Sequence, residues 1–452
     1  MHRVITTIAV LIFAIMLSSP CLADAPQNVV LIMADDIGFE CFSSYGSEEY
    51  STPRLDALAA EGIRFENCHS TPLCTPSRVN IMTGKSNVFN YADFGVYPQG
   101  EPTFAHHFKE HGYATAVAGK WQLLTTNNGI SATEAGFDTY CVWNTPMTAR
   151  ERYWNPSLEC NREILDLPED SFGPEIATSF LIDFIEEKKD VPFLAYYPMI
   201  LPHNPFIPTP DSESREEKDG KKNFVDMVAY LDVCVGRIVD ALEANGLREN
   251  TLVIFTGDNG TNSQLASELF GEEVPGGKGY THDYGTHVPL IVNCPGTIPA
   301  GLLDADLVCF SDFFPTIVEA AGLPPKEIAD GDGMSFWARC QGREGVARQW
   351  IYGYYFPRPY SNRFDNMYNH WEVRYARDRR YKLYANGDLF DTIEDVMETS
   401  PLEPGEPNDR SEQARRVLQE ALNAYPDSGE NVDFGRVKAT PPTRTVGGRA
   451  SR

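Results

Sequence analysis

Two kinds of segment alternate along most of the chain and differ in their hydrophobic pattern. Short runs of β-branched, aliphatic and aromatic residues have the length of buried strands, and longer amphipathic segments have the period of helices. The predicted strands are residues 28–33, 114–118, 192–198, 251–256 and 289–293, and the predicted helices are residues 53–61, 103–110, 174–188, 224–244 and 312–321. This alternation predicts an α/β fold with a large, mixed but mostly parallel sheet sandwiched between helices.

The pattern changes after Leu323, where aromatic and charged residues replace the regular alternation. Residues 381–390 have the pattern of a β-hairpin around Asn386-Gly387. We therefore expect one large domain over residues 24–325 and a small C-terminal α+β subdomain with an antiparallel sheet over residues 326–430. The end of the chain is basic and poor in apolar residues, so residues 431–452 are predicted to be a disordered tail.

The N-terminus has the pattern of an export signal. A short basic start is followed by an apolar run and a small-residue ending before Asp24. We expect residues 1–23 to be a cleaved signal peptide and the mature protein to be periplasmic or secreted; lipid attachment at Cys21 is the weaker alternative, because Pro20 precedes it. No later run is long and apolar enough to span a bilayer. An exported chain can form disulfides, but the scattered spacing of the ten cysteines indicates no disulfide framework.

Acidic residues outnumber basic ones by 64 to 38, which gives a formal net charge of −26. This charge argues against nucleic acid as a partner and against a broad anion-binding surface. An anionic substrate would therefore have to meet individual cations placed at its site. The alternative is that the acidity only keeps an exported protein soluble.

Polar residues follow four of the predicted strands near their carboxyl ends, where open α/β sheets bind ligands. They are Asp35 and Asp36 after the first strand, Lys120 after the second, His203 after the third, and Asp258 and Asn259 after the fourth. Taken singly, Asp36-Ile37-Gly38 and Asp258-Asn259-Gly260 can be ordinary turns. Their shared position at one edge of the sheet favours a binding or catalytic site.

The three carboxylates and the amide of this group are all-oxygen candidate metal ligands. Such a set suits a hard divalent cation, Ca²⁺ or alternatively Mg²⁺, and suits zinc poorly. Ca²⁺ is the preferred interpretation for an exported protein. Asn259-Gly260-Thr261 also matches a glycosylation acceptor, which we treat as accidental because a sugar there would remove the proposed ligand.

Four short motifs occur in order along the chain. They are Cys74-Thr75-Pro76-Ser77-Arg78, AGKW at residues 118–121, GDNG at residues 257–260 and GGKG at residues 276–279. With these motifs the chain resembles the formylglycine-dependent sulfatases, arylsulfatase-like enzymes of the alkaline phosphatase superfamily. The resemblance extends over residues 28–322, and LYANGDLFDTIEDVMETSPL is similar to the C-terminal region of that family.

The resemblance implies that Cys74 is a precursor, which a formylglycine-generating or sulfatase-maturating enzyme converts to formylglycine. Pro76 and Arg78 would serve recognition by that enzyme. An unmodified serine or cysteine that attacked sulfur would leave a stable ester, whereas a hydrated aldehyde offers one hydroxyl to attack and one to expel sulfate. For the pentapeptide alone, a buried free cysteine before a helix is the alternative.

The resemblance also implies roles for the residues at the sheet edge. The metal would be bound by Asp35, Asp36, Asp258, Asn259 and the modified residue 74. Arg78 would hold the diol beside the metal, and Lys120 and Lys278 would neutralise charge on the sulfate and the leaving oxygen. His203, in LPHNP, would protonate the leaving group; a histidine that caps a turn is the alternative.

The chain departs from the family pattern in two places. Gln122 follows the GKW motif where many relatives have histidine, and it can hydrogen-bond to the diol but cannot take a proton at neutral pH. In GTHVP, at residues 285–289, His287 replaces a commoner arginine-containing version and has either a structural or a substrate role. His282 and Asp283 in the same loop are either functional or solvated surface.

We therefore expect a sulfuric ester hydrolase that acts on a sulfated carbohydrate or another sulfated small molecule. One alternative is a phosphate or phosphonate ester hydrolase with the same metal site, and another is a non-catalytic binding protein, which Gln122 favours. The candidate specificity residues, which core or surface packing explains equally well, are Asn90, Tyr91, Asp93, Tyr97, Tyr153 and Trp154.

Overall fold

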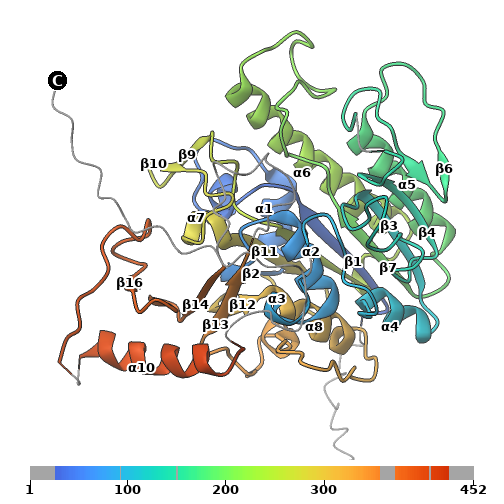
Figure 1. The fold of residues 1–452 in the computed structure, drawn as a ribbon. Coiled ribbons are helices and arrows are strands. Elements are labelled where there is room, and N and C mark those ends of the chain that lie inside the picture. The colour runs from blue at the N-terminus through green and yellow to red at the C-terminus, as the bar shows by residue number, and fades with distance from the viewer. Residues whose placement is uncertain (1–25, 92, 149–150, 357–371, 407–408, 427–452) are drawn as a thin grey trace, which may run out of the picture.

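The computed structural model describes residues 26–91, 93–148, 151–356, 372–406 and 409–426. The predicted signal peptide and the predicted tail lie outside these residues. The described chain forms one large sheet with helices on both faces and a small second sheet near the C-terminus (Figure 1). None of its helices has the length and apolar character of a membrane span. The domain boundaries stay a prediction.

The large sheet has ten strands in the order β12-β2-β11-β8-β1-β7-β3-β4-β5-β6. The strands are β1 Asn28–Ala34, β2 Ile63–His69, β3 Ala114–Lys120, β4 Thr139–Trp143, β5 Glu159–Cys160, β6 Glu163–Ile164, β7 Phe193–Pro198, β8 Thr251–Gly257, β11 His287–Asn293 and β12 Leu302–Cys309. Strands β11 and β5 run in the opposite direction to the other eight strands of this sheet. The five predicted strands are β1, β3, β7, β8 and β11, and the prediction of a mixed, mostly parallel sheet is confirmed.

Helices cover both faces of the sheet (Figure 1). They are α1 Pro53–Ala60, α5 Gly173–Glu187 and α6 Gly220–Ala244 on one face, and α2 Cys74–Thr83, α4 Phe104–Glu110 and α8 Phe313–Ala320 on the other. Because strand side chains alternate, Val30 and Ile32 of β1 belong to the first core, and Val29 and Leu31 belong to the second. The five predicted helices are confirmed; α6 begins earlier than predicted, where the Asp219 side chain accepts hydrogen bonds from its first turn.

The C-terminal part of the described chain forms a four-stranded antiparallel sheet, as predicted. Its strands are β13 Ile351–Tyr355, β14 Val373–Arg377, β15 Tyr381–Tyr384 and β16 Leu389–Asp391. The predicted hairpin joins β15 and β16, and Gly387 in its turn has a φ of 94°, which glycine adopts at little cost. Helix α10, Arg410–Asn423, packs Leu418 and Leu422 against this sheet.

The structure also pairs two of the cysteines. Cys141 of β4 and Cys160 of β5 form a disulfide. The remaining cysteines of the described chain are free and buried. A single bridge accords with the expectation that the cysteine spacings specify no disulfide framework.

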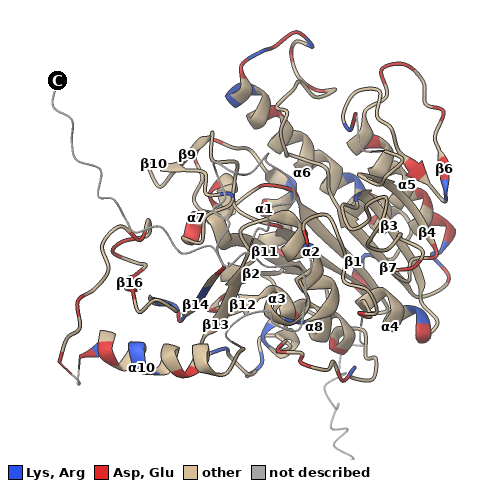
Figure 2. Ribbon diagram, in the orientation of Figure 1, with Lys and Arg blue, Asp and Glu red and all other residues tan. Residues whose placement is uncertain are grey.

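Charged residues of both signs are spread over the loops and helices (Figure 2). A further small sheet consists of β9, Ala266–Leu269, and β10, Glu272–Pro275.

Candidate active site

The carboxyl ends of the parallel strands meet at one edge of the sheet and bring the predicted polar residues together. Asp35 and Asp36 follow β1, Lys120 ends β3, His203 lies beyond β7, Asp258 and Asn259 follow β8, Cys74 begins α2 after β2, and Lys278 lies in the loop before β11. The residues come from segments far apart in the chain. The parallel register of β1 with both β7 and β8 places their ends side by side.

Three carboxylates and an amide form the centre of this edge. Asp35, Asp36, Asp258 and Asn259 are fully buried. The backbone N–H of Asp36 donates to Asp258 Oδ1 at 3.0 Å, and Asn259 Nδ2 donates to Asp36 Oδ1 at 3.0 Å. Ligand atoms of Asp35, Asp258 and the Cys74 thiol all lie within 4.8 Å of one another. The predicted metal ligands therefore converge.

The donor set fits a hard divalent cation. Asn259 Oδ1 is a buried acceptor that receives no hydrogen bond from the described residues. Burial and, after it, the charge of Asp35 raise the pKa of Asp258 to about 8. Additional positive charge among these oxygens would favour the ionised carboxyl and would satisfy the amide oxygen.

Cys74 lies at the N-terminus of α2, and all ten residues of this helix are buried. Burial raises the pKa of the Cys74 thiol, although the charges of Lys120 and Lys278 oppose the shift. A buried thiol with a raised pKa is a poor nucleophile, because the thiolate is the reactive form. The unmodified Cys74 thiol is therefore a weak nucleophile, although it lies among the polar residues of the candidate active site.

Two buried cations border the cluster on the side of Cys74. Arg78 donates to Asp258 Oδ2 at 3.0 Å and to the backbone oxygen of Lys120 at 2.7 Å. Lys120 Nζ lies 2.8 Å from both oxygens of Asp35. Burial raises the pKa of Asp35, but the charges of Lys120 and Arg78 contribute to holding it well below its usual range. This pairing keeps Asp35 ionised.

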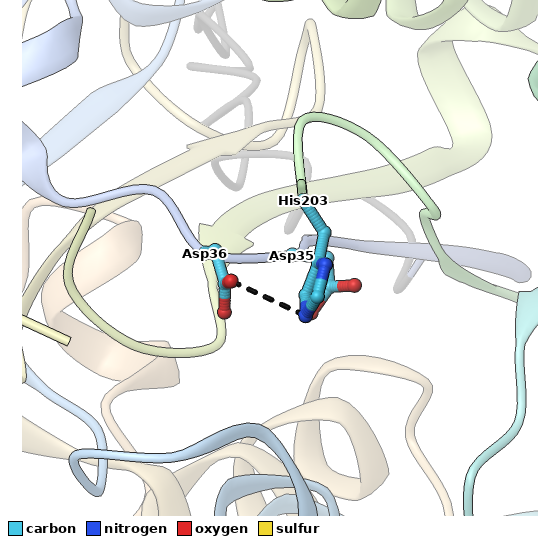
Figure 3. A group of neighbouring side chains, drawn as sticks. All are labelled: Asp35, Asp36 and His203. Carbon is cyan, nitrogen blue, oxygen red and sulfur yellow. Dashed lines mark ion pairs between the residues drawn. The ribbon is translucent and has the colours of Figure 1, made fainter. Parts of the chain in front are cut away.

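His203 and Lys278 both contact Asp36. The Nε2 atom of His203 lies 3.4 Å from Asp36 Oδ2 (Figure 3) and 3.2 Å from Lys278 Nζ. Lys278 also donates to Asp36. Burial lowers the pKa of His203 to about 3, so its imidazole is neutral at ordinary pH even though Asp36 acts in the other direction. His203 Nδ1 lies 2.7 Å from the carbonyl oxygen of Asn204, which favours the proton on Nδ1 in the neutral ring, and Nε2 then accepts from Lys278.

Gln122 lies at the same edge but makes no hydrogen bond to Cys74 in the described part of the chain. Its φ is 55°, and its backbone N–H donates to the carbonyl of Asn144 at 3.2 Å. The side-chain Oε1 is buried and accepts no hydrogen bond from the described residues. The structure therefore places Gln122 next to Lys120 with a side-chain acceptor still unused.

An ion pair and a hydrogen bond connect the loop that carries Lys278 to the C-terminal sheet. Arg377 of β14 donates to Asp283 at 2.5 Å, and Lys382 of β15 donates to the carbonyl of Thr281. The ring of His287 stacks on Phe39 with a centroid distance of 4.0 Å. Asp283 is thus bound to Arg377 and not solvated surface, and His287 has a packing partner.

Most of the candidate specificity residues are structural. Tyr91 and Tyr97 are buried, and Asn90 donates to Thr83 within the same region. Tyr153 is buried and donates to the backbone carbonyl of His203. Trp154 is half-buried and donates to Pro208 O at 2.9 Å.

One residue near His203 was not singled out from the sequence. Arg152 Nη1 lies 3.0 Å from His203 Nδ1, on the opposite side of the imidazole from Lys278. No motif marks Arg152 in the sequence. Its neighbours Tyr153 and Trp154 were the candidate specificity residues predicted in this segment.

Comparison with known proteins finds relatives in sequence and in structure. The sulfatase family model matches residues 27–323. Arylsulfatase G of Mus musculus is 31% identical over 368 residues, which cover 69% of this chain and 69% of that protein.

Solved structures share the fold. A structure of BT4656 in complex with its substrate D-glucosamine-2-N,6-O-disulfate superimposes with a TM-score of 0.72 at 20% identity, over 90% of this chain and 99% of that chain. The phosphonate monoester hydrolase of Agrobacterium radiobacter superimposes with a TM-score of 0.65 at 20% identity, over 88% and 95%. At these identities the two structures show a common fold.

Proposed function

The chain belongs to the sulfatase family and is a sulfuric ester hydrolase, and from that premise we propose that it acts through a formylglycine made from Cys74. The observation that carries the proposal is the position of Cys74. It is a buried thiol within 4.8 Å of two carboxylates, and burial raises its pKa, which disfavours the reactive thiolate. When it carries formylglycine, the hydrated aldehyde supplies one hydroxyl for attack on sulfur and a second for release of sulfate.

We propose that Asp35, Asp36, Asp258, Asn259 and residue 74 hold a divalent cation, Ca²⁺ in preference to Mg²⁺. The fully buried oxygens of this set and the unused Asn259 Oδ1 support the proposal. A bound divalent cation would supply positive charge that polarises the sulfate. Arg78, fixed by Asp258 and by the carbonyl of Lys120, would hold residue 74 in place beside the carboxylates.

The remaining polar residues have roles that follow from their positions. Lys120 and Lys278 flank the carboxylates and would stabilise charge on the sulfate and on the leaving oxygen. As the imidazolium, which the charge of Asp36 favours, His203 would protonate the leaving oxygen from Nε2 and return to the neutral ring. Gln122, with its buried and unused Oε1, would hydrogen-bond to one hydroxyl of residue 74.

The proposed substrate is a sulfated carbohydrate outside the cytoplasm. Support comes from the fold shared with BT4656, whose substrate is a sulfated glucosamine. The disulfide between Cys141 and Cys160 accords with export, because disulfides persist in oxidising compartments. Export also agrees with the signal peptide predicted for residues 1–23.

A phosphate or phosphonate ester hydrolase is the second candidate, because a phosphonate monoester hydrolase shares the fold. Protein produced together with a maturating enzyme should be assayed on matched aryl sulfate and aryl phosphate esters and on defined sulfated saccharides. We expect release of sulfate to exceed release of phosphate by a wide margin. Preferential release of phosphate would favour the second candidate, and no release from any ester would favour a non-catalytic binding protein.

A further inference from the structure

Arg152 differs from most arginines in the described part of the chain in having no acidic partner there. Among the described residues, no carboxylate lies within salt-bridge distance of its guanidinium, although acidic residues are spread over the fold (Figure 2). By contrast, Arg78, Arg215, Arg348 and Arg377 are each paired with an aspartate. A half-buried cation without an anion in such an acidic chain is a candidate binding group.

The guanidinium of Arg152 is held in a fixed position beside the active site. Its Cζ lies 4.4 Å from the centroid of the Trp143 ring, which places the cation over the aromatic face. Its Nη1 lies 3.0 Å from His203 Nδ1, which also lies 2.7 Å from the carbonyl oxygen of Asn204. A guanidinium has five N–H donors, so most of them remain available to a ligand.

A second unused donor belongs to the tryptophan ring that the guanidinium covers. Trp143 is buried, and its Nε1–H has no acceptor among the described residues. Trp143 is the last residue of β4 and pairs in register with Lys120, which contacts Asp35. Unused donors on Arg152 and Trp143 are complementary to a group that only accepts hydrogen bonds, such as a carboxylate or a sulfate.

The position of Arg152 separates this group from the sulfate that is cleaved. His203 Nε2 faces Asp36 and Lys278, whereas Nδ1 faces Arg152 and the Asn204 carbonyl, so the imidazole ring lies between the guanidinium and the carboxylate cluster. A second substituent on the same sugar, or on the next sugar, would lie there. We propose that Arg152 and Trp143 form a subsite for a second anionic group of the saccharide, an inference that rests on the proposed function. The second group is either a uronate carboxylate or a second sulfate.

Binding to an inactive variant tests this subsite without depending on turnover. Calorimetry with Cys74→Ala protein compares D-glucosamine-2-N,6-O-disulfate with N-acetyl-D-glucosamine 6-sulfate, and a 6-sulfated chondroitin disaccharide with its uronate methyl ester. We expect the doubly anionic member of at least one pair to bind about tenfold or more tightly than its partner. The pair that shows the difference identifies sulfate or carboxylate as the second group.

Adding Arg152→Gln to the Cys74→Ala protein should abolish this preference and leave the affinity for the singly charged member within about twofold, while Arg152→Lys should retain part of it. Arg215→Gln is the matched control, because Arg215 also lies over a tryptophan, Trp154, but is paired with Asp170. It should leave the preference intact. Equal affinities within both pairs, or a preference that survives Arg152→Gln, would overturn the proposal.

If Arg152→Gln lowered the affinity for both members of a pair equally, the proposal would also be overturned, because Arg152 would then act only through His203. Thermal unfolding of Arg152→Gln establishes that the variant is folded. If only the subsite proposal is wrong, the mature enzyme still releases sulfate. Failure of the proposed function appears as absence of sulfate release whatever the binding preference.

Discussion

The Nζ atom of Lys120 lies 2.8 Å from each carboxylate oxygen of Asp35, and both side chains are buried. This pair joins the end of β3 to the end of β1 at the centre of the candidate active site. Asp35 is a proposed cation ligand, and Lys120 is a proposed partner of the sulfate. The proposed cation ligand Asp35 and the proposed sulfate-binding residue Lys120 are therefore in direct contact.

Replacement of this lysine tests its proposed role. Lys120→Ala should lower kcat about 100- to 1,000-fold, because a preorganised charge at the reacting group is lost. The measurement is the rate of sulfate release with fully modified protein. Lys85→Ala is the matched control, since Lys85 is also buried and paired with an acid, Glu101, away from the carboxylate cluster. A loss of threefold or less in Lys120→Ala, with normal folding, would contradict the role.

The cation site predicts a dependence on added metal. Prolonged chelation should lower both sulfate release and the midpoint of thermal unfolding, because a cation that binds only the folded state stabilises it. Ca²⁺ should restore both at lower concentration than Mg²⁺. Asn259→Ala should raise the concentration needed about tenfold or more.

Asn223→Ala is the control for this experiment. Asn223 is a buried amide of α6 that donates to backbone carbonyls of Phe206 and Glu217, so its loss should affect stability and leave the metal dependence unchanged. The site would be refuted if Asn259→Ala and Asn223→Ala showed the same dependence on added cation.

Gln122 is the position at which the sequence departs from the family pattern. If it hydrogen-bonds to a hydroxyl of residue 74, Gln122→Ala should raise the activation barrier by about 1–3 kcal/mol. Gln122→His should keep or raise turnover. Pre-steady-state kinetics on an activated aryl sulfate would show whether release of sulfate becomes the slower step. An unchanged rate in Gln122→Ala would place this side chain outside the reacting groups.

Asp232 predicts a pH dependence of stability away from the active site. Burial raises its pKa to about 6 from an ordinary value of 3.8, although it accepts the backbone N–H groups of Arg54 and Leu55. The folded state therefore binds this proton more tightly than the unfolded state. The resulting stability is fully present below pH 3.8 and is lost as the pH rises through 6, by about 1–3 kcal/mol.

Comparison with Asp232→Asn isolates this contribution. The difference in the free energy of unfolding between the two proteins should change in favour of the variant between about pH 4 and pH 7. Loss of one acceptor adds an offset that does not depend on pH. Chemical denaturation at a series of pH values measures both quantities. A difference that is constant across this range would show that Asp232 does not titrate there.

Much of the fold could be predicted because the central strands are buried on both faces. Val29 to Met33 and Leu252 to Phe255 read as continuous apolar runs, and the polar residues that follow them mark the sheet edge. β2 was not predicted, because Arg64, Glu66 and Asn67 interrupt its apolar pattern.

Helix α2 was also not predicted. All of its residues are buried, Arg78 and Asn80 included, so no polar face marks its period. The sequence motifs predicted the candidate site, but no motif predicted Arg152. Its importance depends on three-dimensional proximity to His203 and Trp143, which no local spacing in the sequence encodes.

The most direct test of the central claim relates modification of Cys74 to activity in the same preparations. Protein would be produced with graded amounts of a maturating enzyme, the fraction of formylglycine at residue 74 measured by peptide mass spectrometry, and sulfate release measured in parallel. The account predicts that specific activity rises in proportion to the modified fraction and extrapolates to zero with none, and that Cys74→Ala is inactive but folded. Activity that is independent of the modified fraction, or that persists in Cys74→Ala, would contradict it.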